Sequence, residues 1–346
     1  MPEQSFPAKR SAISVVSLLT AVVGAALLAF TVRQVGWSAV VAGITSVGWA
    51  FLLVLALGAL RMAVRARAWM LCAAEPAPPP HSHTPAPSHR LPFGTAFGAI
   101  LAADALGNLT PLGLLASEPA KVMLARARIS TVAGLASVTI ENAFYTASVV
   151  VVLLTGTWFF VQRTDAPVIL ARAAEIVVVG ALVAGVAGFW ITRTRPAVLS
   201  RLEPLFSRLL GKSSTSVEML REVETRIYDV FRWPFERVSR VAVWEGAFHV
   251  LAVLEVWLVL RLLPTSAHVT LVDAFVMESA GRFVTVAFKF IPLRLGVDEA
   301  GSGAVAQILG FGTVTGVTLA LVRRLRIIVL NAAGLVILAR GRGLAP

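Results

Sequence analysis

Six apolar stretches, each close to the length needed to cross a bilayer, constrain this chain more than any other feature. They cover residues 11–32, 47–64, 130–158, 172–192, 241–263 and 314–339. Hydrophobic residues make up 57% of the 346 and charged residues 14%, so one water-soluble core could not bury this much apolar surface. Only helices and closed barrels satisfy the backbone inside hydrocarbon, and runs of this length favour helices. The sequence therefore predicts an all-α, multi-pass membrane protein.

Two further apolar stretches, residues 92–110 and 269–291, carry polar side chains, and a similar octapeptide follows each of them. PLGLLASE covers residues 111–118 and PLRLGVDE covers residues 292–299, so a proline and a glutamate recur at the same spacing. Polar backbone at membrane depth is tolerated where it is buried in protein or lines water. We therefore expect both stretches to form broken or re-entrant helices.

The repeated octapeptides predict a bundle of about eight membrane segments with two internal repeats. The repeats would cover residues 92–158 and 269–339, within a single domain that spans residues 1–346. If both interrupted stretches are re-entrant, the spans that follow them run in opposite directions, as in inverted-repeat transporters. Paired interruptions of this kind point to a binding site between the repeats.

The charge distribution indicates how the chain sits in a membrane. Lysine and arginine outnumber aspartate and glutamate by 31 to 19, which gives a net charge of +12. Basic residues flank the first two spans at Lys9, Arg10, Arg65 and Arg67, and cytoplasmic loops carry such an excess. We therefore predict a cytoplasmic N-terminus, and contact with anionic lipid rather than with nucleic acid.

Two segments outside the spans have compositions of their own. Residues 73–90 contain six prolines and three histidines, which indicates an extended linker, although the histidines could bind a soft metal weakly. Residues 193–240 combine basic charge with apolar residues at helical spacing, which predicts an amphipathic helix at the lipid headgroups.

With Cys72 as the one cysteine and no catalytic or cofactor motif, we predict no disulfide, no cofactor and no enzyme activity.

Polar residues near the octapeptides form the first candidate binding site. Asp104 and Asn108 share one face of a helix, and Glu278, Arg282 and Lys289 form a second stripe by the same spacing. Ionisable residues inside a membrane are expensive and usually functional. Glu278 and Arg282 would either neutralise each other or contact substrate. Lys289 has no carboxylate four residues away and is the better ligand candidate.

The first octapeptide also predicts a helix end. Pro119 suits the first turn of a helix, where a missing N–H is harmless, so Glu118 would lie at the helix start. Such an N-terminus, with Lys121 one turn in, would present free N–H groups to a phosphate. Alternatively, Glu118 only caps the helix. The other residues of the two motifs, which would shape the backbone and position the helix ends, are Pro111, Pro292, Gly296 and Glu299.

Charged residues interrupt two of the long spans. Glu141 lies about a dozen residues into its span, where a charge costs roughly 2.5 kcal/mol or more unless it is paired or hydrated. Arg323 interrupts the last span in the same way, so a Glu141–Arg323 pair is one hypothesis. The alternative places Arg323 and its neighbours at a membrane surface, beside a shorter final helix.

A third polar face lies on the 241–263 span. Helical spacing places Glu245, His249 and Glu255 within one third of the circumference. A proton relay or structural contacts between helices would explain this face, and we favour structural contacts. Two carboxylates and one histidine on one helix are too few for a zinc site, so no metal is predicted.

The chain resembles the flippase-like family typified by the transmembrane region of lysylphosphatidylglycerol synthases. That family shows an Asn, a Pro, a Gly-Glu step and a basic residue, followed by an acidic-Arg pair in the next helix. The corresponding residues are Asn108, Pro111, Ser117-Glu118, Lys121 and Glu141-Asn142. The second family signature is similar to Pro292, the LGVDE of residues 295–299 and Arg323. Asn142 stands where the family usually has an Arg, so any phosphate contact from that position is either lost or taken over by Arg323 or Lys121.

The resemblance implies a bundle of about eight segments in a bacterial inner membrane that moves a lipid between leaflets. The lipid, or another amphiphile, would carry a polar, anionic headgroup; members have been linked to aminoacylated phosphatidylglycerol, hopanoids and polyprenyl-linked glycans. The soluble aminoacyl-transferase domain of some members has no counterpart in this sequence. The chain alone would therefore not aminoacylate a lipid.

The mechanism expected from the resemblance is rocking of the two repeats about a site near the membrane midplane. The side chains that would hold the headgroup are Lys121, Arg282, Lys289 and Arg323. Two alternatives belong to other classes of protein. One is a proton-coupled transporter of a small solute, and the other is a non-transporting scaffold that recruits a lipid-modifying enzyme.

Overall fold

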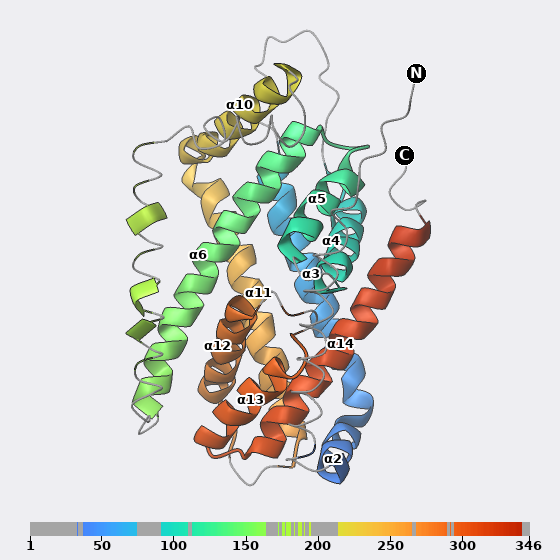
Figure 1. The fold of residues 1–346 in the computed structure, drawn as a ribbon, viewed down its shortest axis with the longest axis vertical. Coiled ribbons are helices and arrows are strands. Elements are labelled where there is room, and N and C mark those ends of the chain that lie inside the picture. Colours follow the sequence, from blue (N-terminus) through green and yellow to red (C-terminus); the bar gives the residue numbers. More distant parts are fainter. Residues whose placement is uncertain are drawn as a thin grey trace, which may run out of the picture.

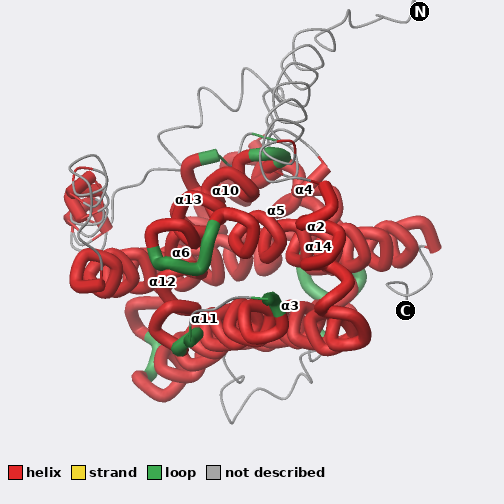
Figure 2. Tube along the Cα trace, turned by 90° about the horizontal axis from the view of Figure 1, so that it is seen from below, coloured by secondary structure: helices red, strands yellow, loops and turns green. Residues whose placement is uncertain are grey.

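The computed structural model consists of helices and their connections wherever it describes the chain (Figures 1 and 2). The described residues are 33, 37–74, 91–109, 113–163, scattered positions between 172 and 194, 214–264, 268–288, 291 and 294–340. The prediction of an all-α fold is confirmed for these residues. The predicted span 11–32, most of the linker 73–90, Pro111, Lys289 and Pro292 lie outside them.

Four long helices run along the long axis of the molecule (Figure 1). They are α3 (Phe51–Ala73), α6 (Thr131–Arg163), α11 (Phe235–Leu262) and α14 (Thr313–Arg340). Three helical stretches, Ile44–Ala73, Thr131–Arg163 and Phe235–Leu262, are long and apolar enough to cross a membrane. They match three predicted spans, but the first continues well past residue 64. Arg65 and Arg67 therefore lie within α3 and do not mark its end.

Helix α14 contains the last predicted span and carries three arginines near its middle. Arg324 and Arg326 are buried, with 8% and 5% of their surface exposed. The alternative of a shorter final helix with these arginines at a membrane surface is therefore wrong. The reason is that buried carboxylates of other helices pair with the guanidinium groups, so the helix continues through them.

Each interrupted stretch forms a helix that packs against a second, shorter helix. The first pair is α4 (Phe93–Leu109) with α5 (Gly113–Ala125), and the second is α12 (Leu271–Ala287) with α13 (Val297–Ile308). Figure 1 shows the first pair in the upper half of the molecule and the second pair in the lower half. α4 and α12 have 17 residues each, so each is about 25 Å long, less than the roughly 30 Å of a hydrocarbon core.

The long helices that follow the two pairs run in opposite directions (Figure 1). α6 begins at the upper end, near α5, and ends at the lower end. α14 begins at the lower end, near α13, and ends at the upper end. These are the directions that the sequence predicts for re-entrant stretches.

The start of α12 is fixed by a capping box. The Thr270 side chain accepts from the backbone N–H of Asp273 (3.2 Å), and the Asp273 carboxylate accepts from the backbone N–H of Thr270 (2.9 Å). Arg163, the last residue of α6, donates to the same carboxylate (2.9 Å).

At the break between α12 and α13, Gly296 has φ +76° just before α13, a conformation that glycine adopts without strain. This conformation is compatible with the backbone role predicted for Gly296, which stays a prediction.

Helix α10 (Ser214–Tyr228) and the 3-10 turn η2 (Asp229–Arg232) lie across the upper end of α6 (Figure 1). They belong to the predicted amphipathic segment 193–240. That segment does not extend to residue 240, however, because α11 already begins at Phe235. Pro234 lies at the N-cap of α11 with extended backbone, so the chain turns there into the long helix.

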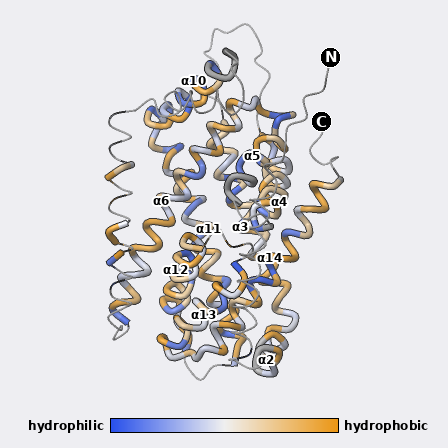
Figure 3. Tube along the Cα trace, viewed as in Figure 1, coloured by the Kyte–Doolittle hydropathy of each residue, from blue (hydrophilic) through white to orange (hydrophobic). Residues whose placement is uncertain are grey.

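Many large apolar side chains of the molecule are exposed and several charged ones are buried, unlike in a typical water-soluble protein. Large apolar side chains such as Leu52, Val151, Trp158 and Val250 are more than half exposed on the long helices. Buried charged residues are distributed over the same helices and are Arg61, Glu141, Glu245, Glu255, Arg324 and Arg326. Figure 3 shows hydrophilic positions among α12, α13 and α14 next to hydrophobic ones. Apolar clusters also fill the bundle, but large exposed apolar side chains combined with buried charges are the pattern of a membrane protein.

Candidate functional site

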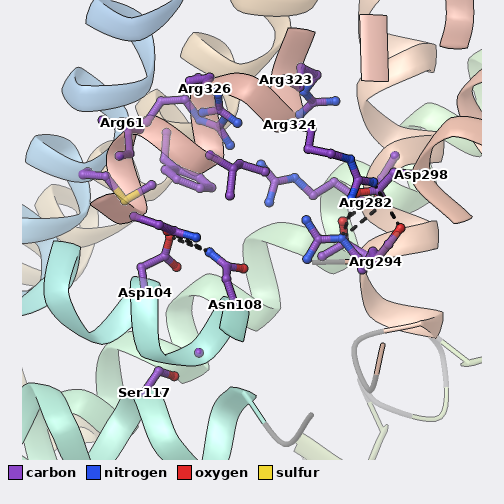
Figure 4. A pocket seen from close by; sticks show the side chains of 18 of the residues that line it. Arg61, Asp104, Asn108, Ser117, Arg282, Arg294, Asp298, Arg323, Arg324 and Arg326 are labelled. Carbon is purple, nitrogen blue, oxygen red and sulfur yellow. Dashed lines mark hydrogen bonds and ion pairs between the residues drawn. The ribbon is translucent and has the colours of Figure 1, made fainter. Parts of the chain in front are cut away.

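The buried charges surround a cavity of about 220 Å³. Its seven lining arginines, most of them labelled in Figure 4, are Arg61, Arg65, Arg282, Arg294, Arg323, Arg324 and Arg326. Its four lining carboxylates are Asp104, Glu118, Glu278 and Asp298. Seven positive and four negative groups form the described lining, and three carboxylates outside it, Glu141, Glu255 and Glu299, pair with five of the seven arginines.

Glu255 of α11 is the centre of the first ion-pair network. Its side chain is 0% exposed and accepts from Nη1 of Arg61 on α3 (3.0 Å). Two arginines of α14 approach its other oxygen: Nε of Arg326 lies at 3.1 Å and Nε of Arg323 at 3.6 Å. One carboxylate therefore serves three guanidinium groups from two helices.

Glu278 of α12 is the centre of the second network. It accepts from Nε of Arg282 (2.8 Å), which confirms the pair predicted from their spacing, and from Nη2 of Arg323 (2.7 Å). Arg323 thus joins both networks, and four arginines share Glu255 and Glu278. Four minus two leaves an excess of two positive charges, or of one when Asp104, which lies across the cavity in Figure 4, is included.

The second octapeptide supplies a separate ion pair at the edge of the cavity. Glu299, in the first turn of α13, accepts two hydrogen bonds from Arg324 of α14 (2.6 and 2.8 Å) and is 0% exposed. Nη2 of Arg324 also lies 3.3 Å from the carbonyl oxygen of Arg294. Because both carboxylate oxygens are engaged by one guanidinium, this pair holds α13 against α14. The geometry supports the positioning role expected for Glu299.

The first octapeptide is arranged differently from its predicted form. α5 begins at Gly113, and Pro119 lies inside it, so the helix start predicted at Glu118 is wrong. The residues before Pro119 are mostly leucine and alanine, strong helix formers that carry the helix back to Gly113. Glu118 therefore does not cap α5. It lines the cavity and accepts from Nζ of Lys121 (2.9 Å).

Glu141 of α6 pairs with a partner that the sequence did not suggest. Its Oε1 accepts from Nε and Nη2 of Arg65 on α3 (3.0 and 2.8 Å), and its Oε2 lies 3.7 Å from Nζ of Lys121. The hypothesis of a Glu141–Arg323 pair is therefore wrong. Glu141 faces α3 and α5, whereas Arg323 faces α11 and α12.

Asp104 and Asn108 share a face, as predicted, and line the cavity opposite the arginines (Figure 4). The Asn108 amide donates to Asp104 Oδ2 and to Asn331 Oδ1, both at 3.2 Å. This side chain therefore links α4 to α14. Asn142, at the position where the related family carries an arginine, also lines the cavity.

The sequence did not single out five of the seven arginines at the cavity, which are Arg61, Arg65, Arg294, Arg324 and Arg326. Arg65 looked like a cytoplasmic flank, and Arg61 lies in the same apolar run with no acidic residue near it. Arg326 was noted only as one of a basic group. A possible signal was the number of arginines within apolar stretches, because each of them needs a buried counter-charge.

A double-mutant cycle distinguishes the two pairings of Glu141. We expect Glu141→Gln and Arg65→Gln to be strongly non-additive in unfolding free energy, with a coupling of about 0.5–3 kcal/mol. Glu141→Gln combined with Arg323→Gln should be additive, because no contact joins these side chains. Thermal unfolding of the purified protein in detergent measures both cycles. Equal coupling in the two cycles would contradict the arrangement seen in the structure.

The family model described as lysylphosphatidylglycerol synthase TM region matches residues 15–334. No curated protein and no solved structure matches the chain. The family match includes every helix that lines the cavity, and it is a match to a membrane region. With its apolar exterior, its candidate membrane spans and this match, the chain belongs to the lysylphosphatidylglycerol synthase transmembrane-region family of flippase-like membrane proteins.

Proposed function

We propose that this protein binds the anionic headgroup of a lipid in its cavity and moves the lipid between the leaflets of a bacterial inner membrane. The observation that carries the proposal is that four arginines share two carboxylates at the cavity wall. Positive charge that is not balanced by a carboxylate is costly in a low-dielectric interior. An anionic headgroup would balance it through charge-assisted hydrogen bonds.

The size of the cavity favours a small headgroup. A water molecule occupies about 30 Å³ in the liquid, so 220 Å³ corresponds to about seven waters. That volume accommodates a phosphate group with a few further non-hydrogen atoms. On the opposite wall, Asp104, Asn108 and Asn331 offer hydrogen bonds to polar atoms beyond the phosphate.

The arrangement of helices supports movement of the lipid by two inverted repeats. In this proposal α4, α5 and α6 form one repeat, and α12, α13 and α14 form the other, with the cavity between them. The matching order of helix lengths and the opposite directions of α6 and α14 support it. Rocking of one repeat against the other would open the cavity to each side in turn. Lys289, just beyond α12, would add a further cation.

Removal of Arg323 tests the proposal with little expected damage to the fold. In Arg323→Gln, Glu278 keeps Arg282, and Glu255 keeps Arg61 and Arg326. We expect exchange of a fluorescent anionic phospholipid in liposomes to fall at least about tenfold, because a charge-assisted hydrogen bond contributes about 1.5–3 kcal/mol. The matched control is Arg261→Gln, an exposed arginine on α11 outside the cavity, which should exchange lipid like the wild type.

Three outcomes would contradict the proposal. Exchange equal to that of empty liposomes across a panel of anionic and zwitterionic headgroups would exclude lipid movement and favour a scaffold that recruits a lipid-modifying enzyme. Equal losses in Arg323→Gln and Arg261→Gln would show that charge at the cavity does not matter. If a small anionic solute rather than a lipid were moved, uptake of that solute would depend on Arg323 while lipid exchange would not.

A further inference from the structure

Two titratable side chains on α11 are buried without full hydrogen bonding. Glu245 is 1% exposed, and neither of its carboxylate oxygens has a hydrogen-bond partner among the described residues. His249, one turn along the same helix, is 5% exposed. Its Nε2 lies 2.9 Å from Oγ of Ser148, whereas its Nδ1 has no partner in the described structure. Neither group belongs to the ion-pair networks of Glu255 and Glu278.

The charges around Glu245 are already engaged with another carboxylate. The titratable groups that face it are Arg65 and Cys72 of α3, Lys121 of α5 and Glu141 of α6. Both cations among them pair with Glu141, at 2.8 and 3.7 Å. An ionised Glu245 would therefore be a buried anion beside a second anion, with no ion-pair partner among the described residues. The neutral acid avoids both costs.

His249 lies in a neighbourhood that also favours a neutral side chain. The charged groups facing it are Arg61 and Arg65 of α3 and Glu278 and Arg282 of α12, three cations against one anion. The Tyr145 ring stacks on its imidazole at a centroid distance of 6.1 Å. Tyr145 and Phe248 line the cavity, so His249 lies directly behind the cavity wall. A neutral imidazole at this place can accept a proton at one nitrogen.

We propose that Glu245 is a proton-binding site that couples protonation to the state of the headgroup cavity. Glu245 holds a proton while Arg65 and Lys121 remain with Glu141. It loses that proton, by way of His249 or of water in the cavity, when one of these cations turns from Glu141 to it. Lys121 also binds Glu118, which lines the cavity, so the exchange of partners reaches the headgroup site. Only the coupling rests on the proposed function; proton binding by Glu245 does not.

Infrared spectroscopy of the full-length protein in a detergent that contains no carbonyl group tests the proton site directly. A protonated carboxylic acid has a C=O stretching band that a carboxylate lacks. We expect the wild type to show this band at neutral pH and Glu245→Gln, an isosteric and neutral replacement, to lose it. Glu236→Gln removes a largely exposed carboxyl of the same helix and should leave the band unchanged. Glu245→Asp should shift the band, which gives the same test in a second variant.

Absence of the band in the wild type, or its persistence unchanged in Glu245→Gln, would overturn the proposal. Coupling is tested by imposing a pH gradient on the liposomes during exchange of the anionic phospholipid. The gradient should change the wild-type rate several-fold and should have no effect in Glu245→Gln. Equal wild-type rates with and without the gradient would overturn the coupling. If no vesicle exchanges lipid at all, the proposed function fails, and the infrared band still decides whether Glu245 binds a proton.

Discussion

Glu255→Gln is expected to destabilise the folded protein by roughly 3–5 kcal/mol. Glu255 is the carboxylate that Arg61, Arg323 and Arg326 share in the interior. Glutamine fills the same volume but removes the negative charge, so the buried guanidinium groups of Arg61 and Arg326 and the half-buried one of Arg323 lose a counter-charge at once. Arg323 keeps Glu278, whereas Arg61 and Arg326 keep no other ion pair among the described residues.

Thermal unfolding in detergent, followed by size-exclusion chromatography of the heated samples, measures this loss. The matched control is Glu236→Gln on the same helix, where the Glu236–Arg240 pair is exposed and contributes only about 0–1 kcal/mol. We expect the control to unfold within a few degrees of the wild type. A Glu255→Gln protein that unfolds together with the control would show that the network does not carry the stability assigned to it.

Gly334→Ala is expected to force α14 away from α4 and to cost about 1–3 kcal/mol. A Cβ atom at Gly334 would lie 2.2 Å from the carbonyl oxygen of Leu101 and 2.7 Å from its carbonyl carbon. These are backbone atoms of a helix and cannot rotate aside as a side chain could. Because the same interface holds the hydrogen bond from Asn108 to Asn331, lipid exchange should fall together with stability.

Gly246→Ala is the matched control for this prediction. Gly246 lies inside α11, and a Cβ atom there would meet nothing within 4 Å. Alanine should therefore stabilise the helix by about 0.5–1 kcal/mol, because it reduces the entropy lost on folding. Opposite shifts in unfolding temperature are expected for the two substitutions. Shifts of the same sign would show that helix propensity, and not close helix packing, decides the effect at Gly334.

Much of the fold could be predicted from the sequence because its signals are local. Long apolar runs gave α6, α11 and α14 with bounds within six residues, and the octapeptides marked the two breaks. Spacing along a helix also gave the Glu278–Arg282 pair and the shared face of Asp104 and Asn108. These contacts join residues four apart, and helix geometry fixes such neighbours.

The partners of the remaining charges could not be predicted in this way. Arg61 and Glu255 are 194 residues apart, and Arg65 and Glu141 are 76 apart. In the sequence, Arg65 follows an apolar run, which is also the position of a residue that flanks a span. The rule for basic flanks cannot separate such a residue from one that lies within a longer helix and pairs with a buried carboxylate. The Glu141–Arg323 hypothesis failed because local spacing does not show which residues of remote helices lie in contact.

The sequence by itself determined that this chain is a helical membrane protein with charged breaks in its apolar segments, since both properties follow from composition and local spacing. Only the tertiary structure decided which carboxylate neutralises which arginine, and that more arginines than carboxylates meet at one cavity. Ion pairing depends on distances between helices that are remote in the chain. The packing of the helices places four arginines around Glu255 and Glu278, and it gives Glu245 no hydrogen-bond partner among the described residues.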